Sequence, residues 1–378
     1  MNTSPTEPPT QDGPGPESSS NEARHGLSRR AFTRGAGAAA GISLLGGWAS
    51  SAASAASSPK RVTNLRGSVS GAPNLPAGFT DTFTSRFIRA GGIRQHVVIG
   101  GDGPPLLLVH GWPQNWYAWR LVMPALARHF EVIAPDQRGI GLTDKPQDGY
   151  DPGNLANDLV ALMDALGHQR FAVVGTDTGL PISYALAADH PHRVERVALA
   201  EVPGPPGAVP QPPLFLPAAV NNKLWHIAVN RLDKLNEQLA VGREDLYFGY
   251  EFAIQAATKL PDDVVAYYVG LLTNPDSLRG TFAFYREWDT MMAQNAKRAK
   301  RPLRMPVLGI GGEASHANAV GDAMKSLATD VQTAVIAGAG HWFAEEAPEE
   351  TVAALAAFLA PYRDGSAASG APHAGAVR

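Results

Sequence analysis

The chain has 378 residues, enough for one large domain or two ordinary ones, and it carries 32 basic and 35 acidic residues with a formal net charge of −3. This near balance gives no sign of a nucleic-acid partner or of binding to a charged membrane surface. Cysteine is absent, which excludes disulfides, cysteine-ligated metals and a thiol nucleophile.

Residues 1–58 are predicted to be a twin-arginine-type signal segment. Ser28-Arg29-Arg30-Ala31-Phe32 resembles the twin-arginine export signal, a weakly apolar run follows from Gly35 to Trp48, and Ala53-Ser54-Ala55 would suit a signal peptidase. This order predicts export to the periplasm or the cell exterior, whereas the alternative is a disordered tail that happens to hold two arginines. The apolar run is too short and too rich in Gly and Ala for a membrane span. A linker rich in Pro, Gly and Ser is expected at 59–78.

From about Phe79, short apolar runs alternate with helical stretches such as Asn154–Leu166 and Thr351–Tyr362. This alternation predicts an α/β fold with a mostly parallel central sheet and helices on both faces. Active sites of such folds lie at the carboxyl ends of the strands. The expected strands are QHVVIG, PPLLLVHG, FEVIAPDQ, RFAVVGTD, RVALAEV, MPVLGIGG and VQTAVIAG.

The alternation stops in the second half of the chain, where a Pro-rich stretch is followed by a helical one. We interpret this insert as a helical cap over the sheet. The predicted divisions are a first core part at 79–202, the cap at 203–301, a second core part at 302–363 and a disordered tail at 364–378.

The stretch FAVVGTDTGLPISYALA predicts a buried strand at Phe171–Val174, a sharp turn at Gly175–Gly179 and a helix from Leu180. The turn has the shape of a G-x-S-x-G nucleophile elbow, but Asp177 stands in place of the serine. A carboxylate that attacks a saturated carbon forms an ordinary ester and expels a leaving group. We therefore predict Asp177 as the nucleophile of a displacement at carbon; the alternative is a structural Asp in a Gly-rich turn.

Polar residues also follow other predicted strands. His110-Gly111-Trp112-Pro113 follows one, and His341 follows the last. The chain order is then oxyanion loop, nucleophile, acid and histidine, as in α/β-hydrolases. We predict that His341 is the general base that hydrolyses an Asp177 ester, and that the backbone N–H groups of Trp112 and Thr178 hold the oxyanion.

These motifs together resemble the epoxide-hydrolase branch of the α/β-hydrolase superfamily, over roughly residues 79–362. The resemblance rests on HGWP, the D-x-R-G segment that begins at Asp136, the Asp177 elbow and Gly340-His341-Trp342. It implies a capped α/β-hydrolase fold that uses no cofactor and no metal. It further implies a small apolar epoxide as substrate and allows a homodimer.

The acid that would orient His341 has two candidates. Many members of the superfamily have an Asp after the strand that corresponds to MPVLGIGG, but here Glu313 is the nearest acid. Cif-type bacterial epoxide hydrolases and some haloalkane dehalogenases instead place the acid after the strand that follows the nucleophile helix. Glu201 stands there, directly after Val197–Ala200, and is favoured over Glu313.

Opening of an epoxide needs proton donors for the leaving oxygen. His226 in NKLWHIAVN and Tyr285 in GTFAFYREWD resemble the segments that carry the His/Tyr ring-opening pair of Cif-type enzymes. A core role for His226 stays open, as does a different cap tyrosine. The other tyrosines considered are Tyr247, Tyr250, Tyr267 and Tyr268.

Two alternatives to an exported epoxide hydrolase remain at this point. A haloalkane or haloacid dehalogenase uses the same Asp nucleophile, but Thr178 and Trp112 do not match the Trp and Asn halide donors of many haloalkane dehalogenases. Arginines that follow the nucleophile of fluoroacetate dehalogenases are also missing from Thr178–Leu180. The second alternative is a non-catalytic ligand-binding protein that keeps the fold.

Overall fold

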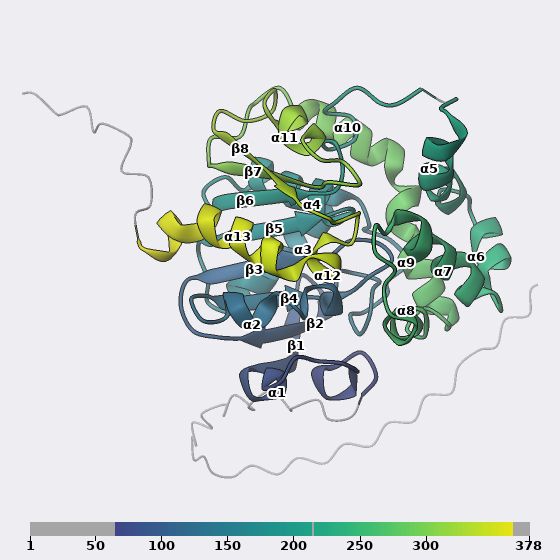
Figure 1. Ribbon diagram of the computed structural model, residues 1–378, viewed down its shortest axis with the longest axis horizontal. Coiled ribbons are helices and arrows are strands. Elements are labelled where there is room, and N and C mark those ends of the chain that lie inside the picture. The colour runs from purple at the N-terminus through teal and green to yellow at the C-terminus, as the bar shows by residue number, and fades with distance from the viewer. Residues whose placement is uncertain (1–64, 214, 366–378) are drawn as a thin grey trace, which may run out of the picture. The chain divides into compact units, whose positions relative to one another are not determined.

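The computed structural model describes residues 65–213 and 215–365, which form a central sheet, flanking helices and a group of helices beside one end of the sheet (Figure 1). The predicted signal segment at 1–58 lies outside the described residues, as do residues 366–378 of the predicted tail. Within the described part of the chain, no helix has the length and apolarity that crossing a membrane requires.

The sheet has eight strands in the order β1-β2-β4-β3-β5-β6-β7-β8. β1 pairs antiparallel with β2, and β2 with β4, while the pairs from β4 across to β8 are parallel. The predicted mostly parallel sheet is therefore confirmed. The strands are β1 (Phe83–Ala90), β2 (Ile93–Gly100), β3 (Pro105–Val109), β4 (Glu131–Pro135), β5 (Phe171–Thr176), β6 (Val194–Ala200), β7 (Val307–Gly312) and β8 (Val331–Ile336).

Both faces of the sheet are covered because strand side chains alternate between two apolar cores. Val173 of β5 packs on the face that holds α3 and α4, whereas Ala172 and Val174 pack on the face that holds α2 and α13. The helices and 3-10 turns of the core are η1 (Val69–Gly71), α1 (Phe79–Thr82), η2 (Trp116–Trp119), α2 (Met123–Leu126), α3 (Pro152–Ala165), α4 (Gly179–Asp189), α11 (Ala319–Met324), α12 (Phe343–Glu346) and α13 (Pro348–Arg363).

The cap predicted between 203 and 301 consists of six helices that begin after a Pro-rich loop. Figure 1 shows α5 to α9 grouped beside one end of the sheet, with α10 leading back to the core. Arg298 of α10 joins cap to core, since its Nε lies 3.0 Å from both carboxylate oxygens of Asp189 on α4. The cap helices are α5 (Ala218–Asn230), α6 (Leu235–Ala240), α7 (Glu244–Gln255), α8 (Asp262–Val269), α9 (Pro275–Arg286) and α10 (Trp288–Arg298).

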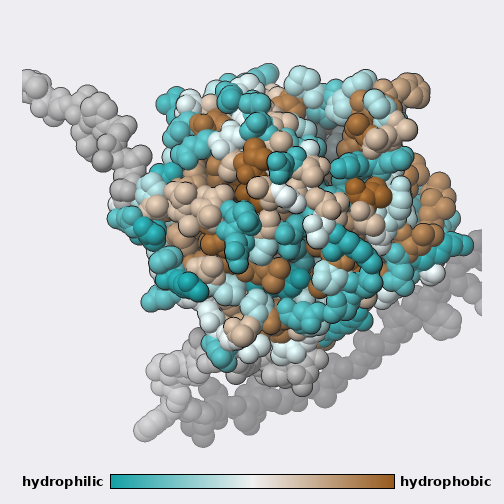
Figure 2. Space-filling model, in the orientation of Figure 1, coloured by the Kyte–Doolittle hydropathy of each residue, from teal (hydrophilic) through white to brown (hydrophobic). Residues whose placement is uncertain are grey.

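The outer surface of the cap is apolar in places. Figure 2 shows mostly hydrophilic residues on the visible face, with hydrophobic residues over the cap at its right-hand side. Among the described residues, most exposed large hydrophobic side chains lie between Phe215 and Tyr250, and Leu246 of α7 is 70% exposed. The inner surface of the cap is apolar as well, but it is buried against the core.

The linker predicted at 59–78 differs from the structure from residue 65 onward. Val69 is buried, its N–H donates to Ser85 Oγ over 2.9 Å, and Trp116 Nε1 donates to the carbonyl of Gly67 over 2.7 Å. Tyr117 donates its hydroxyl proton to the carbonyl of Pro73. Pro and Gly in this stretch shape turns that pack on the first strands, so residues 65–78 belong to the folded core.

Candidate active site

Asp177 lies in a sharp turn between β5 and α4, and its backbone is left-handed with φ of +51°. The flanking glycines are required by close packing. A Cβ added to Gly175 would lie 2.2 Å from Ser183 Oγ, and one added to Gly179 would lie 2.5 Å from the carbonyl oxygen of Val109. The predicted strand–turn–helix elbow is therefore present, and it places the Asp177 side chain beyond the carboxyl end of β5.

The Asp177 carboxylate faces donors on two sides. Its Oδ1 accepts a hydrogen bond from the backbone N–H of Trp112 over 2.8 Å, and the backbone N–H of Thr178 donates a hydrogen bond to the same carboxylate group. Its Oδ2 lies 3.4 Å from His341 Nε2. Burial alone would raise the pKa of Asp177, but the hydrogen bonds to His341, Trp112 and Thr178 outweigh it and hold the pKa below its usual value. The carboxylate is therefore ionised at neutral pH, as a nucleophile has to be.

His341 lies between two carboxylates. Its Nδ1 is 3.2 Å from Glu201 Oε2, and Glu201 is fully buried with its Oε1 bonded to the N–H of Gly312. Burial alone would lower the pKa of His341, but the hydrogen bonds and charges of Asp177 and Glu201 raise the pKa to about 10. In the resting site the imidazole is therefore a cation held by Asp177 and Glu201.

Glu313, the other candidate acid, lies elsewhere. Its side chain is exposed, and its Oε2 accepts a hydrogen bond from the N–H of Gly338 over 2.9 Å. The structure thus brings Glu201, and not Glu313, to His341. The difference arises at the strand ends, because Glu201 follows β6 with φ of +63°, and this turn directs the carboxylate inward.

A further histidine, which the sequence motifs did not single out, lies near this group. His316, in the turn after β7, has a ring nitrogen within 4.8 Å of ligand-type atoms of Glu201 and His341. These three residue types could hold a metal, but His341 has a pKa of about 10 and its ring nitrogens are protonated at neutral pH. Burial lowers the pKa of His316, so it adds no positive charge beside Glu201. Its position near the usual place of the Asp could have drawn attention to it.

The two cap residues meet over the oxyanion loop. His226 of α5 stacks on the Trp112 ring, with centroids 5.1 Å apart and planes at 16°. Tyr285 of α9 meets the same ring edge-on at 5.4 Å and meets His226 at 5.8 Å. Burial raises the pKa of Tyr285 well above its usual value, and the charges of Asp177 and Glu251 act in the same direction. Its phenol therefore keeps its proton at any physiological pH.

The other cap tyrosines are engaged or placed elsewhere. Tyr247 donates to Asn230 Oδ1 over 2.6 Å, and Tyr268 donates to Glu345 Oε2 over 3.1 Å. Tyr250 is exposed, and the ring of Tyr267 packs on Tyr117 at 4.5 Å. Tyr285 is the cap tyrosine whose ring contacts both Trp112 and His226.

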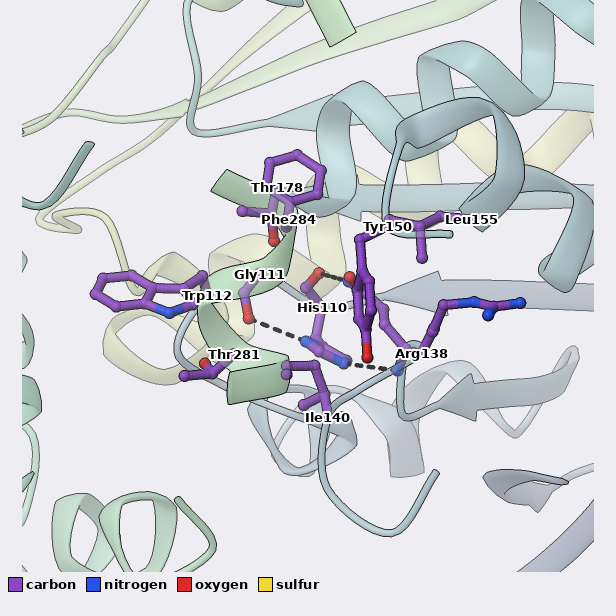
Figure 3. A pocket seen from close by; sticks show the side chains of 12 residues that line it. His110, Gly111, Trp112, Arg138, Ile140, Tyr150, Leu155, Thr178, Thr281 and Phe284 are labelled. Carbon is purple, nitrogen blue, oxygen red and sulfur yellow. Dashed lines mark hydrogen bonds between the residues drawn. The ribbon is translucent and has the colours of Figure 1, made fainter. Parts of the chain in front are cut away.

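A small cavity adjoins the oxyanion loop (Figure 3). Its volume of about 10 Å³ is near the least that one water molecule needs. Gly111, Trp112 and Thr178 line it from the core, and Thr281 and Phe284 of α9 line it from the cap. Asp177 and His341 are not among its lining residues, so the cavity lies beside the reacting groups.

The fold and the site define a capped α/β hydrolase with an Asp, a His and a Glu at the carboxyl ends of its strands. Residues 104–348 match the family model described as the alpha/beta hydrolase fold. The soluble epoxide hydrolase of Corynebacterium sp. (strain C12) is 32% identical over 280 residues, which cover 72% of this chain and 96% of that protein. The fluoroacetate dehalogenase of Burkholderia sp. is 28% identical over 298 residues, which cover 75% of this chain and 96% of that protein.

Among solved structures, the epoxide hydrolase CorEH without ligand matches with a TM-score of 0.69 and 30% identity, over 74% of this chain and 99% of that one. The chain therefore belongs to the α/β-hydrolase superfamily, in its epoxide-hydrolase branch, and it is a hydrolase. This finding favours an enzyme over the non-catalytic alternative.

Proposed function

We propose that the protein is an exported epoxide hydrolase that converts an apolar epoxide into a vicinal diol through an ester of Asp177. The observation that carries the proposal is the meeting of His226 and Tyr285 on the ring of Trp112, whose backbone N–H bonds to Asp177. Trp112 thus contacts the nucleophile Asp177 as well as His226 and Tyr285, the two proton donors for a leaving oxygen. The apolar surroundings, including Phe248 against Trp112, suit an apolar substrate.

In the first step, a carboxylate oxygen of Asp177 attacks one ring carbon, and the bond from that carbon to the epoxide oxygen breaks. The oxygen leaves with the electron pair and takes a proton from Tyr285 or His226. An alkoxide is strongly basic, so this proton lowers the barrier to ring opening. The products of the step are an ester at Asp177 and a neutral hydroxyl group.

In the second step, His341 takes a proton from water, and the water oxygen attacks the ester carbonyl of Asp177. The N–H groups of Trp112 and Thr178 already point at this carboxyl group and would stabilise the oxyanion. Collapse of the intermediate breaks the bond to the alkoxy oxygen, which takes a proton and leaves as the diol. Glu201 stabilises the imidazolium of His341 during this step.

The pKa of His341 determines in which of the two steps His341 can act as a base. In the free site, the Asp177 carboxylate helps to raise the pKa of His341 to about 10, so the ring is protonated and cannot act as a base. Formation of the ester removes the negative charge of Asp177. The pKa of His341 then falls, because burial still favours the neutral ring. His341 becomes a base only once the ester exists.

Removal of halide through the same ester is a second candidate, favoured by the similarity to a fluoroacetate dehalogenase. A halide leaves as a stable anion, which needs hydrogen-bond donors to hold it but no transferred proton. The residues after the nucleophile favour the first candidate, because Thr178–Leu180 hold none of the arginines that clamp a carboxylate substrate, and Trp112 and Thr178 do not match the halide donors of haloalkane dehalogenases.

The deciding experiment is an activity panel on the purified protein. Aryl and alkyl epoxides are tested for diol, and haloalkanes and haloacetates are tested for free halide. Diol from epoxides, without halide release, supports the proposal, whereas halide release alone supports the second candidate. Export rests on the motifs of residues 1–58, and a homodimer stays a prediction that sedimentation velocity tests.

A further inference from the structure

Glu251 is a buried carboxylate in the cap that the sequence motifs did not single out. It lies on α7 and is only 2% exposed. Trp225 Nε1 donates to its Oε2 over 2.8 Å, and Gln255 Nε2 donates to its Oε1 over 2.8 Å. His226 Nδ1 lies 3.1 Å from the same Oε1. Three nitrogen atoms therefore surround this one side chain.

The charge of Glu251 requires compensation, because an isolated buried carboxylate is strongly unfavourable. Within the described part of the chain, His226 is the only basic side chain within 4 Å of it. A carboxylate accepts hydrogen bonds and cannot donate them, so the contact is favourable only when His226 carries a proton on Nδ1. In this structure Nδ1 faces Glu251 at ion-pair distance without hydrogen-bond geometry, and Nε2 takes part in no hydrogen bond among the described residues, so Nε2 is left for a ligand.

We propose that Glu251 is a positioning residue that fixes His226 with a proton on Nδ1 and directs Nε2 to the substrate oxygen. The expected effect of Glu251 on the rate of ring opening rests on the proposed function, whereas the position of the proton on His226 does not. When the ring gives an Nε2 proton to the epoxide oxygen, it keeps the proton on Nδ1, which faces Glu251 Oε1 at 3.1 Å. Solvent water then returns a proton to Nε2 before the next turnover.

The same end of α7 also contacts the catalytic centre in the core. Gln255, one helical turn after Glu251, accepts a hydrogen bond on its backbone oxygen from the N–H of His341 over 3.0 Å. A change of the Glu251 side chain leaves this backbone bond intact. Loss of the Glu251 carboxylate should therefore affect His226 and ring opening, and leave His341 and ester hydrolysis largely unchanged.

The first test is nitrogen NMR of the histidine rings in the full chain, with His226→Gln used to assign the signals. In the wild type we expect His226 Nδ1 to be protonated and to respond to Glu251→Gln. The matched control is Asp245→Asn, an exposed carboxylate on the same helix, which should leave the His226 signals unchanged. A wild-type His226 without a proton on Nδ1 overturns the proposal, and this outcome does not depend on whether Glu251→Gln folds.

The second test is the single-turnover rate of ester formation at Asp177 with styrene oxide as the probe. Glu251→Gln should slow ester formation by about 10- to 100-fold, the loss typical when a hydrogen-bonded partner of a functional histidine in a metal site is removed. Ester hydrolysis should keep its rate, and Asp245→Asn should behave as wild type. Ester formation at the wild-type rate in a folded Glu251→Gln protein overturns the positioning role. A wild type that forms no ester with any epoxide instead contradicts the proposed function, and the NMR result still decides the role of Glu251.

Discussion

Asp177 and Glu201 stand side by side at the ends of two neighbouring parallel strands, and both have left-handed backbone, with φ of +51° and +63°. The two turns direct the carboxylates to opposite nitrogens of His341, at 3.4 Å from Nε2 and 3.2 Å from Nδ1. Left-handed backbone at a residue other than glycine costs about 1–3 kcal/mol and is common at functional sites. The sheet thus supplies both the spacing and the orientation of these two acids.

The first prediction concerns Asp177. Asp177→Ala should abolish both diol formation and the covalent ester, because the displacement has no other nucleophile. The fold should persist, since the turn depends on Gly175 and Gly179 and not on the carboxylate. Product chromatography measures the diol, and thermal unfolding followed by circular dichroism serves as the control. Near-normal diol formation by the folded variant would exclude the ester mechanism.

The second prediction concerns the acid that orients His341. Glu201→Gln should let the substrate form the Asp177 ester but stall its hydrolysis, because the imidazolium loses its stabilising charge. Replacing the acid of a comparable triad by an amide lowers turnover by about 10⁴-fold. Intact-protein mass spectrometry should show the chain heavier by one whole epoxide. Glu313→Gln is the matched control and should turn over normally, because its carboxylate bonds to Gly338 and is exposed.

The third prediction concerns the ring-opening pair. Tyr285→Phe and His226→Gln should each slow ester formation, because the leaving oxygen loses a proton donor. General acid catalysis is typically worth about 10²–10⁴-fold in rate. Rapid-quench measurement of a single turnover separates the two steps. Tyr250→Phe is the control, since Tyr250 is exposed on the cap. A loss confined to ester hydrolysis would show that the pair is wrongly assigned.

Much of the fold could be predicted because apolar runs mark buried strands. Seven of the strands correspond to such runs, and the helix expected at Asn154–Leu166 is found at Pro152–Ala165. β1 was missed because only some of its positions face a core, so that FTSRFIRA mixes polar and apolar residues without a run. Residues 65–78 were interpreted as a linker because their composition says nothing of the hydrogen bonds that hold them to Trp116 and Tyr117.

The candidate site was predictable where a motif has a fixed local geometry, as at the Asp177 elbow. Between Glu201 and Glu313 the sequence favoured Glu201 only by its place after the strand that follows the nucleophile helix, because both acids follow strands and the backbone turn decides where each carboxylate points. Glu251 gave no signal in the sequence, and the only signal for His316 was its position near the usual place of the Asp. Their proximity to His226 and His341 arises from the packing of the cap and of the turn after β7, which local sequence patterns do not encode.

The fourth prediction concerns export. A reporter fused to residues 1–58 should leave the cytoplasm of a bacterial host by the twin-arginine route, because the arginine pair, the apolar run and the small residues stand in the required order. Replacing Arg29 and Arg30 by lysine should block this transport. Reporter activity in fractionated cells provides the measurement. Equal export of the lysine variant would indicate another route.

The fifth prediction concerns the pH dependence of ester hydrolysis. In the free enzyme, His341 should titrate at about pH 10 in NMR spectra, because the hydrogen bonds and charges of Asp177 and Glu201 outweigh burial. In the ester, Asp177 is neutral, so His341 should lose its proton at a distinctly lower pH. Only the neutral ring is a base.

The rate of ester hydrolysis in a single turnover should therefore rise with pH and level off well below pH 10, at the titration of His341 in the ester. Tyr285→Phe is the control for this profile: it slows ester formation but should leave the midpoint of the hydrolysis profile in place. A hydrolysis rate with its midpoint near pH 10 would mean that Asp177 does not set the charge of His341. A rate that falls as pH rises would mean that His341 acts as an acid and not as the base for water.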